Sequence, residues 1–454
     1  MRILITGGRV IDPASEFDKV VDLLIEDGKI VRIGKDMRGA RCEVRGAEPL
    51  EANKGKRSKA AKGGESGLNV DRLMDATGLV VCPGLIDMHV HLRQPGREDK
   101  ETIATGTLAA ARAGFTTVCC MPNTDPVNDT RSVTEFILDT SKREGAVHVY
   151  PVGAITKGLK GEELAEIGEL FEAGCVAISD DGRPVMNAQL MRRAMEYAAM
   201  FDLPVIPHSE DLHLSGKGVA HEGIVATELG LGGIPSASEA AMVARDLLLA
   251  EMTGAQLHIA HVSAAESVRL IREAKARGVR VSCEVTPHHF TLTEEAVRGF
   301  HTHAKMNPPL RAESDRQALL EGLRDGTIEV IATDHAPHTS QDKEQEFDLA
   351  PFGVIGLETA LGVTLTTLVT PGLLTLNQVI AKFTSEPARI LKLPKGRIAE
   401  GGDADLTIFD PNREWTVDAA RFASKSRNTP FQGWRLTGQT VATLVSGKVV
   451  WEAP

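Results

Sequence analysis

Several features that would place this chain in other classes of protein are missing from its sequence. Its six cysteines include no Cys-x-x-Cys pair and most lie in apolar runs, so we expect reduced core residues rather than a disulfide framework. No apolar stretch reaches the roughly 18 residues of a membrane span, and the N-terminus lacks the residue succession of a signal peptide. The formal net charge of −11 is opposite in sign to that of a nucleic-acid-binding surface. These absences predict a cytoplasmic protein that binds neither membrane nor nucleic acid.

Short strands separated by turns are predicted at both ends of the chain. They lie near the N-terminus at about 3–6, 10–11, 21–25 and 29–33, and near the C-terminus at 405–409, 415–417, 438–446 and 448–451. We expect residues 1–80 and 392–454 to pack together as one composite β domain. Residues from about 36 to 72 are rich in Gly, Ala, Lys, Arg and Glu without apolar periodicity, which predicts a flexible insertion.

Residues 81–391 alternate between strand-like and helix-like segments. The apolar runs fall at 85–89, 116–121, 148–152, 175–180, 203–208, 257–261, 281–285 and 329–333. Amphipathic stretches such as 103–113 and 265–277 separate them. Eight strands that alternate with helices predict an α/β fold, a TIM-like (β/α)8 barrel, with the satellite β domain from both chain ends beside it.

His89 and His91 lie two residues apart at the end of the first predicted barrel strand. Side chains at i and i+2 of a strand point to the same face, so the two imidazoles aim at one point. Imidazole is a good ligand for zinc. By itself the pair also fits two hydrogen-bonded histidines at a strand end. Residues elsewhere in the chain are needed to distinguish a metal site from this structural interpretation.

Other ligand-type side chains follow the later barrel strands. Active sites of such barrels form at the C-terminal ends of the strands. At those ends the chain places Asp180 and Asp181, His208, His261, and Asp334. Four histidines with two or three carboxylates fit one or two zinc ions held by nitrogen and oxygen ligands.

A zinc ion held in this way suits the hydrolysis of an amide or imide carbonyl, because it lowers the pKa of bound water and polarises the carbonyl. Asp334 is suited to move a proton to the leaving nitrogen. Arg93 offers a bidentate donor pair for a substrate carboxylate, although a solvated arginine is the plainer interpretation.

Four short motifs support a more specific interpretation. They are Pro83–Arg93 with Pro95-Gly96, Cys120–Thr124, Thr333–His338, and Phe352-Gly353 before Gly356–Thr359. Together they resemble the dihydroorotase signature of the amidohydrolase superfamily, and the resemblance covers nearly the whole chain apart from the insertion.

The fourth barrel strand departs from many members of that superfamily, in which a carboxylated lysine bridges two metal ions. Here the strand ends in Asp180-Asp181-Gly182, as in the longer bacterial dihydroorotases, where aspartate takes the bridging role. Strand alternation alone does not choose between Asp180 and Asp181. The family's spacing to the next histidine favours Asp181.

The resemblance implies reversible cyclisation of N-carbamoyl-L-aspartate to L-dihydroorotate, a step of de novo pyrimidine synthesis, with one or two Zn²⁺ per chain. The implied metal ligands are His89, His91, Asp181, His208, His261 and Asp334. Asp334 would also be the catalytic acid and base. The implied substrate-binding residues are His91, Arg93, Asn123, Asn307, His338, Phe352 and Gly353.

Two alternatives stay open at this point. One is another cyclic-amide hydrolase, of the hydantoinase or allantoinase kind, against which the missing lysine and the presence of Arg93 and Asn123 count. The other is a non-catalytic scaffold for aspartate transcarbamoylase, which would be expected to have lost metal ligands. A homodimer and a complex with aspartate transcarbamoylase are further partners to test for.

Overall fold

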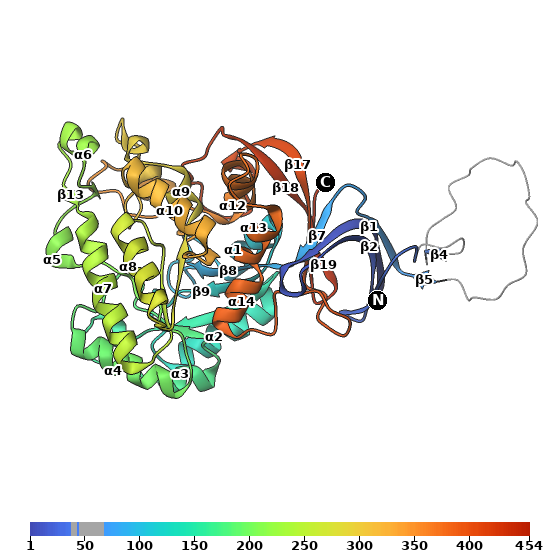
Figure 1. Ribbon diagram of the computed structural model, residues 1–454, viewed down its shortest axis with the longest axis horizontal. Coiled ribbons are helices and arrows are strands. Elements are labelled where there is room, and N and C mark those ends of the chain that lie inside the picture. The colour runs from blue at the N-terminus through green and yellow to red at the C-terminus, as the bar shows by residue number, and fades with distance from the viewer. Residues whose placement is uncertain (38–42, 45–67) are drawn as a thin grey trace, which may run out of the picture.

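The computed structural model describes residues 1–37, 43–44 and 68–454, which form a barrel with a β-sheet beside it (Figure 1). Most of the predicted insertion at about 36–72 lies outside the described residues. At its two flanks, β4 (Glu43–Val44) and β5 (Asn69–Val70) pair in parallel. Within the described ranges, no helix is both long enough and apolar enough to cross a membrane.

Eight parallel segments close the barrel, which confirms the predicted fold class. Seven of them are strands: β8 (Leu85–Val90), β9 (Phe115–Cys120), β10 (His148–Gly153), β11 (Ala177–Ile178), β14 (Leu257–Ile259), β15 (Val281–Val285) and β16 (Val330–Ile331). The fifth predicted strand, 203–208, contributes only single bridges, from Val205 to Ile178 and to Leu257. A bridge between Val90 and His335 closes the circle.

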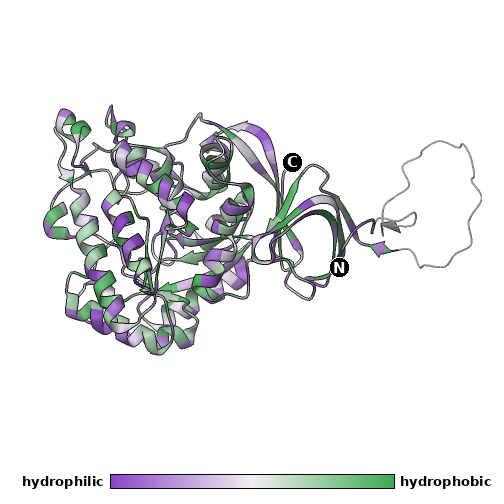
Figure 2. Ribbon diagram, viewed as in Figure 1, coloured by the Kyte–Doolittle hydropathy of each residue, from purple (hydrophilic) through white to green (hydrophobic). Residues whose placement is uncertain are grey.

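Helices cover the outside of the barrel. The longer ones are α1 (Ile103–Ala113), α2 (Arg131–Glu144), α3 (Ile167–Ala173), α4 (Ala188–Met200), α7 (Ser236–Thr253), α8 (Ala265–Ala276), α10 (Glu313–Asp325), α12 (Leu357–Thr364), α13 (Leu376–Phe383) and α14 (Ser385–Leu391). Shorter ones lie in the connections: α5 (Leu212–Ser215), α6 (Ile224–Leu229), α9 (Pro287–Thr291) and α11 (Ser340–Lys343). Figure 2 shows hydrophobic and hydrophilic residues mixed along these helices, as expected where one face is buried.

Helix α1 illustrates how local sequence fixes these elements. The Thr102 hydroxyl accepts from the Thr105 N–H while Thr105 bonds back to the Thr102 N–H, a reciprocal capping box. Gly114 ends the helix with φ of 98°, a left-handed conformation that glycine adopts at little cost. The chain then enters β9 at Phe115, whose fully buried ring meets Phe383 edge-to-face at 5.8 Å.

Strands from both chain ends share the second sheet. Its order is β19-β18-β17-β7-β1-β2-β3, with β6 also paired to β1. These strands are β1 (Arg2–Asp12), β2 (Phe17–Glu26), β3 (Lys29–Gly34), β6 (Arg72–Asp75), β7 (Val80–Pro83), β17 (Leu406–Thr416), β18 (Arg435–Val445) and β19 (Lys448–Glu452). The predicted domain boundary at residue 80 falls where β7 begins, and the division of the chain into two domains stays a prediction.

Candidate metal centre and adjoining cavity

The six predicted ligand side chains meet at the C-terminal end of the barrel. They form two groups that share Asp181: His89, His91 and Asp181, and Asp181, His208 and His261. Within each group the ligand atoms lie within 4.8 Å of one another, and all are buried. Asp334 adjoins the first group, with its Oδ1 2.9 Å from His91 Nε2 and 3.6 Å from His89 Nε2.

The two neighbouring aspartates after β11 face different surroundings. Asp180 accepts the backbone N–H groups of Ile155 at 2.7 Å and Thr156 at 2.9 Å, and also the Thr156 hydroxyl. Asp181 instead places Oδ1 3.3 Å from His89 Nε2 and 3.6 Å from His261 Nε2. Asp180 therefore holds the loop after β10, and Asp181 faces the histidines.

Hydrogen bonds behind the first histidine pair orient their rings. Glu284, fully buried on β15, accepts from His89 Nδ1 at 2.8 Å, and Asn123 Oδ1 accepts from His91 Nδ1 at 2.8 Å. With the proton on Nδ1, each ring turns an unprotonated Nε2 toward the carboxylates. Among the described residues, the buried His89 Nε2 has no hydrogen-bond partner. A buried imidazole lone pair aimed at carboxylates fits a bound metal cation.

The electrostatics of the cluster favour positive charge. Burial opposes protonation of His89, yet the carboxylates of Asp181, Asp334 and Glu284 outweigh it and raise the pKa of His89 well above its ordinary value. Burial likewise opposes ionisation of Asp181, but the surrounding histidines, with His89 first, hold its pKa well below the usual range. A proton or a metal ion would relieve this concentration of negative charge.

Three residues of this site have a left-handed backbone although none is glycine. Arg93 has φ of 61°, His261 of 32° and Asp334 of 47°. Such a conformation costs on the order of 1 kcal/mol or more for a residue with a Cβ, and it persists where surrounding structure enforces it. Each of the three follows a barrel strand, so the strained backbone turns its side chain over the end of the barrel.

A cavity of about 220 Å³ opens above the cluster. All seven residues predicted to bind substrate line it: His91, Arg93, Asn123, Asn307, His338, Phe352 and Gly353. The remaining lining residues are Asp181, Gly182, His208, Asp334 and Ala336. His89 and His261 are not among them, because they lie below the floor of the cavity with almost no exposed surface.

One cavity wall is built around the His338 ring. Its Nε2 donates to the Phe352 carbonyl at 2.8 Å, and its Nδ1 accepts from the Lys100 ammonium at 3.1 Å. Burial, with the nearby charges of Arg93, Lys100 and Lys343, lowers the pKa of His338 to about 2. His338 is therefore a neutral imidazole that joins the segment after β8 to the Phe352 backbone.

The motifs did not reveal Glu284 or Lys100. Glu284 had a usable signal, because an acidic residue inside the apolar run Val281–Val285 has to find a partner in the barrel. Lys100 lies in a polar segment, and nothing in its sequence context distinguishes it from a solvated lysine.

Comparisons with known proteins agree with this geometry. Residues 78–267 match a family described as Dihydro-orotase-like, and residues 240–451 match the Amidohydrolase family. The Dihydroorotase of Pelotomaculum thermopropionicum is 57% identical over 452 residues, which cover 100% of this chain and 99% of that protein. The Dihydroorotase of Syntrophotalea carbinolica is 53% identical over 451 residues, covering 99% of each chain.

Similar solved structures share the architecture at lower identity. An L-hydantoinase (dihydropyrimidinase) from Arthrobacter aurescens has a TM-score of 0.84 and 26% identity, covering 99% of this chain and 96% of its own. A dihydropyrimidinase from Brevibacillus agri has a TM-score of 0.81 at 22% identity, covering 100% of this chain and 95% of its own, a likeness that shows the fold alone.

Proposed function

Because this chain belongs to the dihydroorotase family of the amidohydrolases, we propose that it catalyses the reversible cyclisation of N-carbamoyl-L-aspartate to L-dihydroorotate in de novo pyrimidine synthesis. Membership confirms the resemblance carried by the sequence motifs. It also counts against a hydantoinase, because the full-length identity of 57% is to a dihydroorotase, whereas the hydantoinase structure quoted above is 26% identical.

One observation carries the proposal: a single cavity is lined both by Arg93 and by four members of the His–Asp cluster, which are His91, Asp181, His208 and Asp334. Dihydroorotate is a cyclic imide that bears a carboxylate. Its ring carbonyl would lie against the cluster while its carboxylate pairs with Arg93, whose planar donor pair matches a carboxylate. Hydantoin and dihydrouracil lack that carboxylate and would leave the partly buried Arg93 without an anionic partner.

We propose zinc as the metal, with one or two ions per chain. His89, His91 and Asp334 would hold one ion, His208 and His261 would hold a second, and Asp181 would contact both. When bound, zinc lowers the pKa of water and polarises a carbonyl oxygen.

Asp334 is proposed as the acid and base of the reaction. In the hydrolytic direction its carboxylate accepts a proton from the attacking water and donates it to the ring nitrogen as the C–N bond breaks. In the direction of ring closure the same carboxyl group takes the proton from the ureido nitrogen and passes it to the departing water. Burial opposes ionisation of Asp334, but the positive charge of His89 and His91 outweighs it and keeps its pKa below the ordinary value. A metal cation held by these histidines would supply that positive charge in their place, so the carboxylate would start as a base.

The other cavity residues would hold the substrate. Arg93 lies with its Nε 3.2 Å from the Pro337 carbonyl, which leaves the rest of its donor set toward the cavity. Asn307 donates to Glu210 at 2.8 Å and also lines the cavity. Asn123, His338, Phe352 and Gly353 complete the proposed pocket.

The test compares L-dihydroorotate with 5,6-dihydrouracil, the same ring without the carboxylate, as substrates of the zinc-loaded chain. We expect turnover of dihydroorotate alone. Turnover should be lost in Asp334→Asn, and the zinc content of that variant is measured alongside because Asp334 is also a proposed metal ligand. Arg93→Gln should lower kcat/KM for dihydroorotate by about a hundredfold, as expected when a buried carboxylate loses its charged partner. Preferential turnover of dihydrouracil would contradict the proposal.

The proposal also covers where the enzyme is located and what it assembles with. We propose a cytoplasmic enzyme, and we keep a homodimer and a complex with aspartate transcarbamoylase as assemblies to test. The scaffold alternative would leave the isolated chain inactive. Turnover by the isolated chain, followed by sedimentation alone and with added aspartate transcarbamoylase, separates these alternatives.

A further inference from the structure

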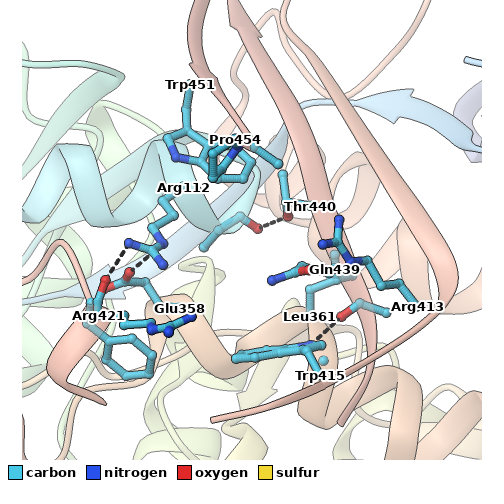
Figure 3. A pocket seen from close by; sticks show the side chains of 15 residues that line it. Arg112, Glu358, Leu361, Arg413, Trp415, Arg421, Gln439, Thr440, Trp451 and Pro454 are labelled. Atoms are coloured by element: carbon cyan, nitrogen blue, oxygen red, sulfur yellow. Dashed lines mark hydrogen bonds and ion pairs between the residues drawn. The ribbon is translucent and has the colours of Figure 1, made fainter. Parts of the chain in front are cut away.

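A segment from the far end of the sequence crosses from the second sheet to the mouth of the barrel. This segment, residues 423–429, lies between β17 and β18 and contains no helix or strand; we call it the strap. It begins beside the hollow in Figure 3, where Arg112 contacts the Arg421 carbonyl and pairs with Glu358. Glu358 also accepts the backbone N–H groups of Ala423 and Ser424. The strap is thus anchored to α12.

The strap next bonds to the segment that follows β8. The Ser424 hydroxyl donates to Glu101, and the Lys425 N–H donates to the same carboxylate at 3.1 Å. The Ser426 hydroxyl donates to the Lys100 carbonyl at 2.9 Å. Glu101 is fully buried, so these bonds are shielded from water. The segment that supplies Lys100 to His338 is therefore held from the opposite end of the chain.

Asn428, near the end of the strap, lies behind the cavity wall with 2% of its surface exposed. Its Oδ1 accepts the backbone N–H of His338 at 3.3 Å. Its Nδ2 donates to two carbonyls, of Ala336 at 3.0 Å and of Gly353 at 3.1 Å. Its own carbonyl accepts the Ile355 N–H at 3.0 Å. One amide side chain thereby joins the segment after β16 to the Phe352-Gly353 segment.

The two segments that Asn428 joins are in close contact. A Cβ placed on Gly353, where φ is 123°, would lie 2.8 Å from Ala336 Cβ and 3.1 Å from His338 Nε2. Ala336, His338 and Gly353 all line the cavity. A change in the spacing of these segments would therefore change the width of the cavity where the substrate ring lies.

We propose that Asn428 is a positioning residue for the reaction assigned above: together with the direct His335–Val354 bridge between the two wall segments, its amide fixes their spacing and thereby the fit of the substrate. The inference rests on the proposed dihydroorotase activity. Only an amide side chain of this size can make these hydrogen bonds, because Oδ1 accepts one bond while the two N–H groups of Nδ2 donate two. Aspartate has the same shape but no donor, so both carbonyls would face an anionic oxygen.

The test is the kinetics of Asn428→Asp in the zinc-loaded full-length chain. Misplacement of binding groups by about 1 Å costs on the order of a hundredfold in catalytic efficiency. We expect at least about a tenfold rise in KM for L-dihydroorotate, a smaller fall in kcat, and unchanged zinc content. The matched control is Asn412→Asp, the same substitution at an exposed position of β17, which should leave KM as in the wild type.

A merely structural role would lower the melting temperature and the active fraction, hence kcat, and leave KM unchanged; that result would overturn the proposal. If Asn428→Asp does not fold, Asn428→Ser removes at least one of the two carbonyl bonds without adding charge and is judged by the same KM. Binding of orotate, the unsaturated ring with the same carboxylate, provides a measurement without turnover. Wild-type chain that binds orotate but turns over no dihydroorotate contradicts the proposed function, whereas equal orotate affinity in wild type and variant contradicts the role of Asn428.

Discussion

Replacing Glu284 by glutamine should weaken zinc binding although Glu284 is not among the proposed metal ligands. Its carboxylate serves two imidazoles, His89 Nδ1 at 2.8 Å and His258 Nε2 at 3.2 Å. Burial opposes its ionisation, but the bonds to His258 and His89 lower its pKa to about 2, so it is an anion at neutral pH. Glutamine has one acceptor oxygen and one NH2 group. It can serve only one of the two rings in the same way.

The size of the expected loss in zinc affinity depends on which imidazole ring loses its hydrogen-bond acceptor. If the glutamine NH2 faces His89 Nδ1, the His89 proton moves to Nε2 and blocks the lone pair that points at Asp181. Loss of such an outer carboxylate typically lowers metal affinity by about 10- to 100-fold, equivalent to about 1.4 to 2.8 kcal/mol. We expect a fall of that size for Glu284→Gln.

Competition for zinc between the protein and a chromophoric chelator at neutral pH measures the affinity directly. Glu329→Gln is the matched control, because Glu329 immediately precedes β16 at the opposite end of the barrel and pairs with Lys275. Thermal unfolding of both metal-free variants separates loss of fold from loss of metal. Wild-type zinc affinity in Glu284→Gln, together with reduced stability, would refute the argument that Glu284 sets the His89 tautomer.

Three further predictions concern metal, backbone and pH. Removing zinc with a chelator should lower the melting temperature and readdition should restore it, since a ligand at a hundred times its Kd stabilises by about 2.7 kcal/mol; an unchanged melting curve would contradict a metal centre here. Gly353→Ala should destabilise the protein by about 1 to 3 kcal/mol and raise KM, because φ of 123° is strained and the new Cβ meets Ala336, as urea unfolding and kinetics would show. Asp405, paired with Lys395, has a pKa lowered to about 2 because its hydrogen bond to His148 and the ion pair outweigh burial. The ionised Asp405 should therefore add about 2 kcal/mol to the free energy of unfolding relative to Asp405→Asn. Urea unfolding should show this difference in full above pH about 4 and a smaller one as the pH falls toward 2. A difference that grew on acidification would contradict the lowered pKa.

The sequence predicted the features that depend on local pattern. The His-x-His spacing placed His89 and His91 on one face because strand alternation is a property of any strand. Closure of the barrel followed from the alternation of strands and helices, although the run at 203–208 forms only bridges at Val205. Alternation could not choose between Asp180 and Asp181, since the choice depends on which one meets the Ile155 and Thr156 backbone.

Features that depend on distant contacts could not be predicted in this way. Asn428 follows no barrel strand, and the hydrogen-bond partners of its side chain lie 75 to 92 residues away in the chain. Lys100 meets His338 across 238 residues. The residue types alone do not distinguish these side chains from ordinary polar surface residues, because their role arises only when folding brings the segments together.

The sharing of one sheet by both chain ends also sets an order of events during synthesis. Strand β7 pairs with β1 on one side and with β17 on the other. At this junction Leu85 bonds to Thr407 across 322 residues. One edge of β7 therefore stays without its native neighbour while the ribosome makes the entire barrel, and high contact order of this kind slows folding. The exposed edge during this interval is a site where another nascent chain can pair, so translation speed past residue 400 should influence how much protein aggregates.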